Sequence, residues 1–168
     1  MAISVRISDK LVNEAKIYSK AEKRSLTGQI EYWALIGKCA IDNPDLTYNM
    51  IKEILIGLTE LDQGESSEYK FGWFILKIYQ SRLFEKKIKI FNKQEKEVLD
   101  NVIGNIAKDP TIGDMKKGDL IGVYVYKFKI KTVQYLLAYR IKNNNLELIM
   151  IGPHENYYRD LKTYIKTR

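Results

Sequence analysis

One polar stretch divides the sequence into two parts of different character. Residues 62–72 (DQGESSEYKFG) hold two Gly and two Ser, and no other part of the chain looks like a linker. Before this stretch one short strand pattern is followed by helical patterns, whereas the part after it contains three closely spaced strand patterns. Since 168 residues suffice for two small domains, we place a domain boundary at the end of the stretch, near Gly72.

The net charge changes sign twice along the chain. Residues 1–40 carry +3, residues 41–72 carry −5 and residues 73–168 carry +9. An acidic segment between two basic ones can lie across a basic surface that would otherwise attract phosphate. A solvated acidic helix is the alternative interpretation. The overall +7 and the twelve tyrosines favour a nucleic-acid partner, although the charge balance alone is a weak indication.

Composition excludes several classes of protein. Cys39 is the only cysteine, so the chain is not a disulfide scaffold. No apolar run approaches the ~18 residues that span a membrane, and the first residues lack the apolar core of a signal sequence, so we expect a cytoplasmic protein. One histidine and scattered carboxylates form no metal-ligand cluster, so we expect neither a metal nor another cofactor.

The first forty residues predict a strand followed by two helices. Ile3, Val5 and Ile7 alternate with polar or small residues, which is the period of a half-buried strand, and helices are expected after Ser8 and Ser25. So short a unit buries too little core to be stable alone. Two copies could pair their strands in an antiparallel ribbon above four helices, which makes a homodimer the expected state.

Such a ribbon fits the major groove of DNA. With the three aliphatic residues facing inward, Ser4 and Arg6 would face the bases, and Ser25 and Thr27 at a helix start would meet a phosphate. The alternative is that Ser4 and Arg6 are only the solvated face of an edge strand.

A third helix is expected from Thr47 onward. It carries an apolar stripe that can dock in a groove of another domain, formed by Met50, Ile51, Ile54, Leu55 and Leu58. Together with the acidic residues beside it, this stripe predicts an arm that covers a basic partner surface.

The second part predicts a mixed arrangement of helices and antiparallel strands. A strand at residues 73–79 precedes a helical hairpin that breaks near Asn92 and stops at Pro110. Strands are expected at residues 121–130, 133–142 and 146–152, joined by two hairpin turns, and a short helix at residues 154–166. The chain as a whole is therefore expected to be α+β.

The sequence resembles two families in succession. The segments AISVRISDKLVNEAK and QIEYWALIGKCAIDNPDL resemble the ParD-like ribbon-helix-helix antitoxins over about residues 1–72. The segments KKGDLIGVYVYKFKI, QYLLAYRI and IGPHENYYRDLK are similar to the RelE/ParE toxin superfamily over about residues 74–168. The resemblance implies a DNA-binding and dimerisation unit at 1–44, a toxin-neutralising helix and linker at 45–72, and a toxin at 73–168, in which a helical hairpin lies on a small sheet with a C-terminal helix.

The toxin resemblance also implies site residues. A basic or imidazole residue after the last strand, and an aromatic residue soon after it, match His154 and Tyr158, and a Lys-x-Lys on a strand matches Lys127 and Lys129. Many mRNA interferases, which are the mRNA-cleaving toxins of this superfamily, carry an arginine where this chain has Leu136. The cations that could replace it are Arg140, Arg159 and Lys117.

Each of these residues also has an ordinary structural interpretation. His154 could cap a helix, the tyrosines after it could be core or rim aromatics, and Lys127 and Lys129 could be a solvated strand face.

The function implied is that of a type II toxin–antitoxin protein. The toxin would be a ribosome-dependent, metal-independent mRNA endoribonuclease that leaves a 2′,3′-cyclic phosphate, and the antitoxin would hold it inactive and bind operator DNA. Neutralisation could occur within one chain or between two. Two alternatives stay open: a gyrase poison of the ParE type, and a DNA-binding regulator with a degenerate toxin domain.

Overall fold

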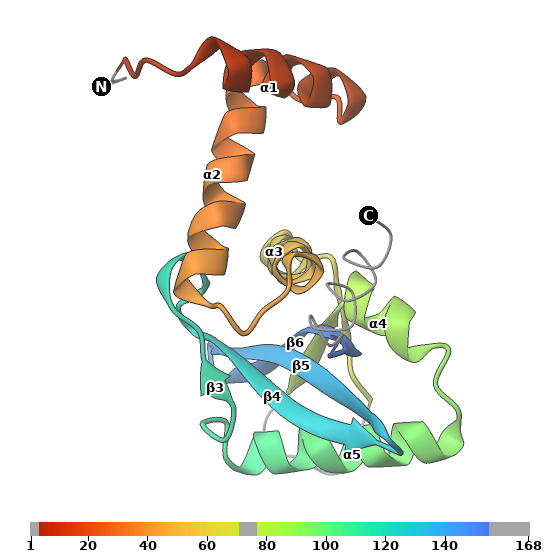
Figure 1. The fold of residues 1–168 in the computed structure, drawn as a ribbon. Helices are drawn as coiled ribbons and strands as arrows, with labels where there is room; N and C mark the ends of the chain where they lie inside the picture. Colours follow the sequence, from red (N-terminus) through yellow and green to blue (C-terminus); the bar gives the residue numbers. More distant parts are fainter. Residues whose placement is uncertain (1–3, 71–76, 155–168) are drawn as a thin grey trace.

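In the computed structural model, which describes residues 4–70 and 77–154, a mixed sheet lies between helices from both parts of the chain (Figure 1). Three helices come first and two more follow the first sheet strands. These helices are α1 (Asp9–Ala21), α2 (Leu26–Asp42), α3 (Tyr48–Asp62), α4 (Arg82–Ile88) and α5 (Lys93–Lys108). The α1–α2 pair projects away from the sheet, whereas α3 lies across it. The predicted α+β class is confirmed.

Polar caps fix where the helices begin. The side chains of Ser8, Ser25, Thr47, Ser81 and Asn92 each accept a hydrogen bond from a backbone N–H in the first turn of the helix that follows. At Asn92 the Glu95 carboxylate also accepts from the backbone N–H of Asn92, which completes a capping box. The predicted helix starts and the predicted break at Asn92 are confirmed.

The sheet has six strands in the order β1-β2-β6-β5-β4-β3. Their bounds are β1 (Ser66–Glu68), β2 (Ile78–Ser81), β3 (Asp114–Met115), β4 (Val123–Ile130), β5 (Val133–Lys142) and β6 (Asn145–Pro153), and a 3₁₀ turn, η1 (Gly118–Leu120), precedes β4. Strands β2 and β6 are parallel, and all other neighbours are antiparallel.

Two tight turns join the three long strands. Asn143 and Asn144 both have positive φ, as does Lys131 in the other turn. Asparagine tolerates this left-handed backbone better than most residues, so the asparagine run suits the tight β5–β6 turn. Both predicted hairpins are confirmed.

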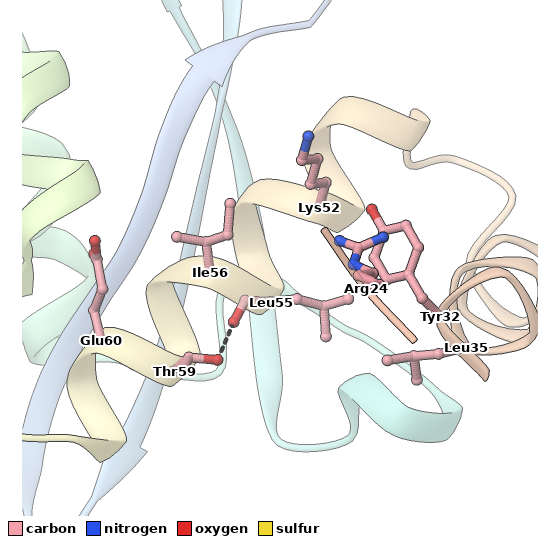
Figure 2. A pocket seen from close by; sticks show the side chains of 8 residues that line it. All are labelled: Arg24, Tyr32, Leu35, Lys52, Leu55, Ile56, Thr59 and Glu60. Carbon is pink, nitrogen blue, oxygen red and sulfur yellow. Dashed lines mark hydrogen bonds between the residues drawn. The ribbon is translucent and has the colours of Figure 1, made fainter. Parts of the chain in front are cut away.

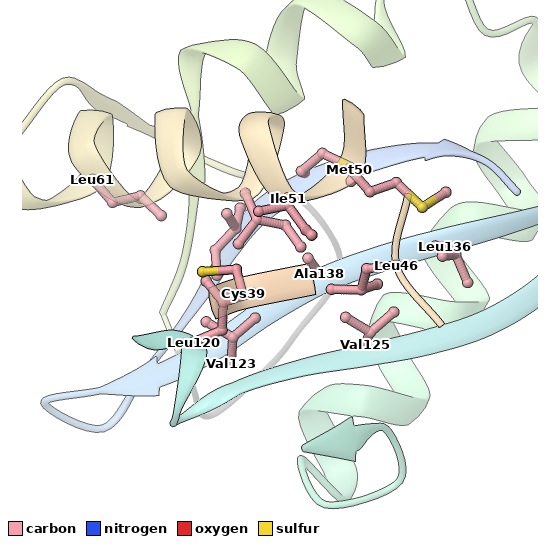
Figure 3. Close-up of a cluster of buried hydrophobic side chains, with 13 residues drawn as sticks. Cys39, Leu46, Met50, Ile51, Leu61, Leu120, Val123, Val125, Leu136 and Ala138 are labelled. Carbon is pink, nitrogen blue, oxygen red and sulfur yellow. The ribbon is translucent and has the colours of Figure 1, made fainter. Parts of the chain in front are cut away.

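Each face of the sheet has its own core. On one face, Leu99, Ile103 and Ile106 of α5 pack on the sheet with Tyr139. On the other, Ile51 and Ile54 of α3 pack on a patch of strand residues that includes Val123, Val125, Leu136 and Ala138 (Figure 3). Helix α3 therefore supplies the second layer of a sheet whose long strands all come from the second part of the chain.

The contact between α3 and β6 is unusually close at one glycine. A Cβ atom built on Gly57 would lie 2.4 Å from the carbonyl oxygen of Ile149, so only glycine lets the helix approach this strand. This contact fixes how deeply α3 seats on the sheet.

Two expectations about the first part need correction. Residues 4–8 were expected to be part of a strand, but they form none, and Val5 is 73% exposed; Ile3 lies outside the described residues. A ribbon strand needs a partner strand, and a single chain offers none here. The polar stretch expected to be a linker contains β1, which pairs with β2 and so extends the sheet.

Other expectations meet gaps in the description. The expected strand at residues 73–79 is seen only from Ile78 onward, and the expected terminal helix lies outside the described residues. The domain bounds at residues 44 and 72 stay predictions.

We expect Gly57→Ala to lower the free energy of unfolding by about 1–2 kcal/mol, because the added methyl group must push α3 away from β6. Gly37→Ala is the matched control in α2, since a Cβ there meets nothing within 4 Å. It should raise stability by about 0.5–1 kcal/mol through helix propensity. Urea denaturation followed by circular dichroism measures both, and equal shifts of the same sign would contradict the close contact.

Candidate functional site

The candidate catalytic lysines lie on the face of the sheet that α3 covers. Alternate residues of a strand share a face, so Lys127 and Lys129 point to the same side as Val123 and Val125, which pack in the α3 core. Both lysines are exposed. The Nζ atom of Lys127 lies 3.6 Å from Asp45 Oδ2 and 3.5 Å from Asp114 Oδ2.

The strand register brings His154 to the same region. Lys129 pairs with Gln134 across β4 and β5, and the backbone N–H of His154 donates to the carbonyl oxygen of Gln134 at 2.7 Å. These three residues therefore form one row across three strands. At about 4.8 Å per strand, the Cα atoms of Lys129 and His154 are roughly 10 Å apart.

A second row lies beside the first. Lys127 pairs with Leu136, which pairs with Gly152. Directly opposed residues share a face, so the two rows place both candidate lysines and His154 on one side of the sheet. The His154 side chain is half-buried, and its Nδ1 atom finds no hydrogen-bond partner among the described residues.

Among the described candidates, Arg140 is not brought to these rows. Arg140 lies four residues along β5 from Leu136, roughly 13 Å away at the strand rise. Its guanidinium is held by Glu147 Oε2 and Asp62 Oδ1, both at 2.6 Å. Tyr158 and Arg159 lie outside the described residues.

Leu136, at the position where the toxin resemblance implies an arginine, is fully buried. It packs in the α3 core with Val125, Leu46 and Met50. The middle of the candidate rows is therefore apolar and serves as part of the surface on which α3 docks.

Carboxylates from the acidic segment meet cations of the second part along the whole length of α3. The pairs are Asp45 with Lys116 at 2.8 Å, Glu53 with Lys87 at 2.5 Å, Asp62 with Arg140 and Lys142 at 2.6 Å each, and Glu65 with Arg82 at 3.0 Å. Glu60 also accepts a hydrogen bond from the backbone N–H of Leu83, at the start of α4, at 2.9 Å. The expected contact between an acidic arm and a basic surface is thus present within one chain.

These contacts change the proton affinities of two carboxylates. Hydrogen bonds from Arg140 and Lys142 lower the pKa of Asp62 to about 2. Partial burial works to raise the pKa of Asp45, but the hydrogen bond from Lys116 and the charges of Lys116 and Lys127 together lower it. Both groups are therefore anionic throughout the physiological pH range.

The predicted apolar stripe of α3 lies against the sheet, as expected of an arm that docks on the second part of the chain. Met50, Ile51 and Ile54 are buried in the core above the sheet, and Leu55 and Leu58 are partly buried against it. The neutralising role of these five residues stays a prediction.

A small cleft lies between α3 and the end of β6. Its volume is about 120 Å³, and its lining residues are Thr47, Asn49, Met50, Glu53, Lys87, Gly152 and Pro153. Pockets that hold small ligands measure roughly 300–1,000 Å³, so the docked helix leaves too little room here for a nucleotide.

Sequence reasoning missed a second contact between the two parts. Asn43 is buried, its Oδ1 accepts from the backbone N–H of Lys117 at 2.9 Å, and its Nδ2 donates to the carbonyl oxygens of Lys117 and Cys39. Nearby, Lys38 Nζ lies 2.9 Å from Asp119 Oδ2. The sequence indicated only that Asn43-Pro44 ends a helix, and nothing local marks this asparagine as a bridge across 74 residues.

The candidate DNA-contacting residues lie at the far end of the molecule. Ser4 and Arg6 are exposed in the extended segment before α1, and Thr27 is exposed in the first turn of α2. The Ser25 hydroxyl accepts from the backbone N–H of Gly28 at 3.0 Å, so it caps α2.

A larger cleft, of about 330 Å³, separates α2 from α3 (Figure 2). Leu35 and Leu55 contribute to its apolar lining, and the Arg24 guanidinium lies 3.8 Å from the centre of the Tyr32 ring at its rim. The Tyr32 and Tyr48 hydroxyls are 3.1 Å apart, which ties α2 to the start of α3.

Among residues 4–70 and 77–154, no group of three or more His, Cys, Asp or Glu side chains could hold a metal ion. No helix there is both long and apolar enough to cross a membrane.

Comparison with protein families matches each part to a different model. Residues 2–70 match the ParD-like antitoxin of the type II bacterial toxin–antitoxin system, and residues 78–162 match the ParE-like toxin of the same kind of system. No curated protein and no solved structure matches the sequence. The acidic helix docked on a basic sheet is thus the contact between these two matched regions. The chain belongs to the type II toxin–antitoxin proteins, with a ParD-like antitoxin followed by a ParE-like toxin in a single polypeptide.

Proposed function

We propose that the toxin part cleaves RNA and that the antitoxin part keeps it inactive in the intact chain. The observation that carries this proposal is the pair of rows that places Lys127, Lys129 and His154 on the sheet face occupied by α3. A ribosome-dependent endoribonuclease acting on mRNA is the specific form of the proposal.

The chemistry follows from what RNA offers. The 2′-hydroxyl attacks the adjacent phosphorus, the bond to the 5′ oxygen breaks, and the products are a 2′,3′-cyclic phosphate and a 5′-hydroxyl. This reaction needs proton transfer at both oxygens and positive charge at the pentacovalent phosphorane. In our proposal His154 transfers a proton and Lys127 and Lys129 stabilise the phosphorane, while Tyr158 is assigned from the sequence resemblance alone.

The antitoxin opposes this chemistry in two ways. Asp45 occupies the neighbourhood of the Lys127 ammonium, where a substrate phosphate would have to bind. Helix α3 packs over the apolar middle of the rows, where Leu136 is buried, and the cleft beside Gly152 measures about 120 Å³. Charge competition and steric exclusion therefore act on the same face.

We also propose that the antitoxin part binds operator DNA as a homodimer. The extended residues 4–8 expose Val5, and the α1–α2 pair leaves Ile17 and Ile41 more than two-thirds exposed. Pairing of two such segments into a ribbon would bury part of this apolar surface and present Arg6 outward.

Toxicity of the separated parts tests the cleavage proposal. Expression of residues 73–168 should arrest growth and cut mRNA on translating ribosomes, and co-expression of residues 1–72 should restore growth. The variants His154→Ala and Lys127→Ala of the fragment should each lose at least about 100-fold in cleavage rate, as expected for loss of proton transfer or charge stabilisation.

Both variants should still be captured by residues 1–72, which shows that they remain folded. Arrest without RNA cleavage, but with accumulation of gyrase–DNA cleavage complexes, would contradict the proposal in favour of gyrase poisoning. No arrest at all would favour a degenerate toxin domain.

Charge pairing at α3 should contribute modestly to the stability of the intact chain. Asp62→Asn should lower the free energy of unfolding by about 1 kcal/mol, because Asp62 is half exposed and its ion pairs are partly screened by solvent. The control is Glu68→Gln, an exposed carboxylate of the same acidic segment without a described ion pair, which should change stability by less than about 0.5 kcal/mol.

The pH dependence of this contribution has a definite sign. The folded pKa of Asp62 is about 2 and its ordinary value is 3.8, so its contribution is complete above pH 4 and is lost as the pH falls from 4 to 2. The difference between the parent chain and Asp62→Asn should therefore be constant from pH 5 to 8. A difference that already shrinks between pH 7 and 5 would contradict the assignment.

Arg6→Ala should weaken binding of the full-length protein to its own promoter about tenfold or more, since a bidentate arginine contact with guanine is worth roughly 1–3 kcal/mol. Lys23→Ala, an exposed lysine in the turn between α1 and α2, should change the affinity far less. Gel mobility shifts measure both variants, and light scattering measures the oligomeric state. Equal losses for the two variants, or a monomer on DNA, would overturn the ribbon proposal.

A further inference from the structure

A second basic surface lies where two turns of the toxin part meet, and in the described part of the chain Lys87 is its one lysine that forms an ion pair with α3. We call it the basic tip and define it as residues 86–96 and 129–131. Lys131 Nζ lies 3.2 Å from Glu95 Oε1, and the rings of Phe91 and Tyr135 make an edge contact at 5.7 Å. These contacts hold the α4–α5 turn beside the β4–β5 turn, as the ribbon also shows (Figure 1).

The basic tip holds most of the excess charge of the chain. It contains seven lysines and one acidic residue, Glu95, for a net charge of +6, whereas the whole chain carries +7. Charge of this density on a protein surface attracts polyanions.

Most lysines of the basic tip form no ion pair with a carboxylate of the antitoxin part among the described residues. Lys87, Lys89 and Lys131 pair with Glu53, Glu85 and Glu95. No ion pair in the described part of the chain involves the other four lysines of the tip, which are Lys86, Lys93, Lys96 and Lys129, and all four are exposed. By contrast, Lys116, Arg140 and Lys142 on the α3 side are neutralised by antitoxin carboxylates.

An apolar side chain stands among these lysines. Ile90 is 85% exposed at the middle of the α4–α5 turn. It gains nothing from the uniformly charged backbone of a duplex, whereas an unstacked base offers it an apolar face. A surface with lysines around one apolar side chain therefore fits a single strand of nucleic acid better than a double helix.

We propose that the basic tip binds single-stranded RNA, and that the intact, self-covered chain retains this binding. Lys129 belongs both to the tip and to the row that contains His154, so a strand held at the tip leads directly to the candidate catalytic face. The proposal rests on the RNA-cleaving function proposed above and adds a binding surface that antitoxin docking does not cover.

Fluorescence anisotropy with a short labelled single-stranded RNA and the full-length chain tests this proposal. The triple variant Lys86→Gln, Lys93→Gln, Lys96→Gln should bind about tenfold more weakly near physiological salt. It should also lower the slope of log K against log salt by about 2, because each phosphate contact on a single strand contributes roughly 0.7 to that slope. Ile90→Ser should weaken binding without changing the slope, since it removes no charge.

The matched control replaces three exposed lysines of α1, Lys10, Lys16 and Lys20, by glutamine. It should keep the parent affinity within about twofold and lose little of the slope. Circular dichroism melting should show all variants folded. The proposal is overturned if the control loses as much affinity as the triple variant, if the parent chain does not bind RNA at low salt, or if non-operator duplex DNA competes as well as RNA.

This outcome is separable from that of the cleavage test. If the triple variant of the full-length chain binds RNA as well as the parent chain, while fragment 73–168 arrests growth and cuts mRNA, the tip proposal fails and the proposed function stands. If RNA binding depends on the tip lysines but fragment 73–168 does not cleave RNA, the tip proposal stands and the proposed function fails.

Discussion

The whole arrangement depends on the need of the sheet for a layer on each face. Helix α5 covers one face with side chains from the toxin part itself, around Leu99 and Tyr139. The opposite face presents Val123, Val125, Leu136 and Ala138, an apolar patch for which residues 77–154 of the toxin part provide little cover. Since burial of apolar area is the main source of stability, that patch requires an apolar partner, and Ile51 and Ile54 of α3 provide it. The antitoxin part is therefore a layer of the fold as much as it is a neighbouring domain.

Charge and apolar packing have different tasks in this contact. The exposed ion pairs at Glu65 and Asp62 each contribute little free energy in water. These pairs help to position α3, because carboxylates at residues 45, 53 and 62 meet cations in a loop, in α4 and in β5. Gly57 adds a steric condition, since any larger residue would hold the helix off β6. Packing supplies the energy, while charge and backbone contact define the geometry.

Local patterns in the sequence were sufficient to predict most of the helices and strands. Ser25 and Asn92 mark helix starts because a cap depends on residues three positions away, and the asparagine run marks a turn because few other residues accept positive φ twice in succession. The apolar stripe of α3 was readable because its period is that of a helix.

Features that depend on contacts between distant residues could not be predicted from the sequence. The row of Lys129, Gln134 and His154 depends on the register of three strands, which the sequence only partly constrains. Asn43 gives no sign that its partner is Lys117, and Ser66–Glu68 is too short and polar to suggest a strand; it pairs with β2 because the chain brings it to a free sheet edge. The N-terminal strand was expected for the opposite reason, since its alternation is clear but residues 4–8 find no pairing partner among the described residues.

The pairing of β1 with β2 has a consequence for stoichiometry. Only residues 69–77 separate the two strands, and the strands are adjacent and antiparallel, so the covalent joint closes a short loop within one molecule. Docking of α3 is then a unimolecular equilibrium governed by an effective local concentration and not by the abundance of a separate partner chain. Dilution, unequal synthesis or unequal gene dosage cannot change the one-to-one ratio of the two parts. Only a break in the chain between them would make that ratio adjustable.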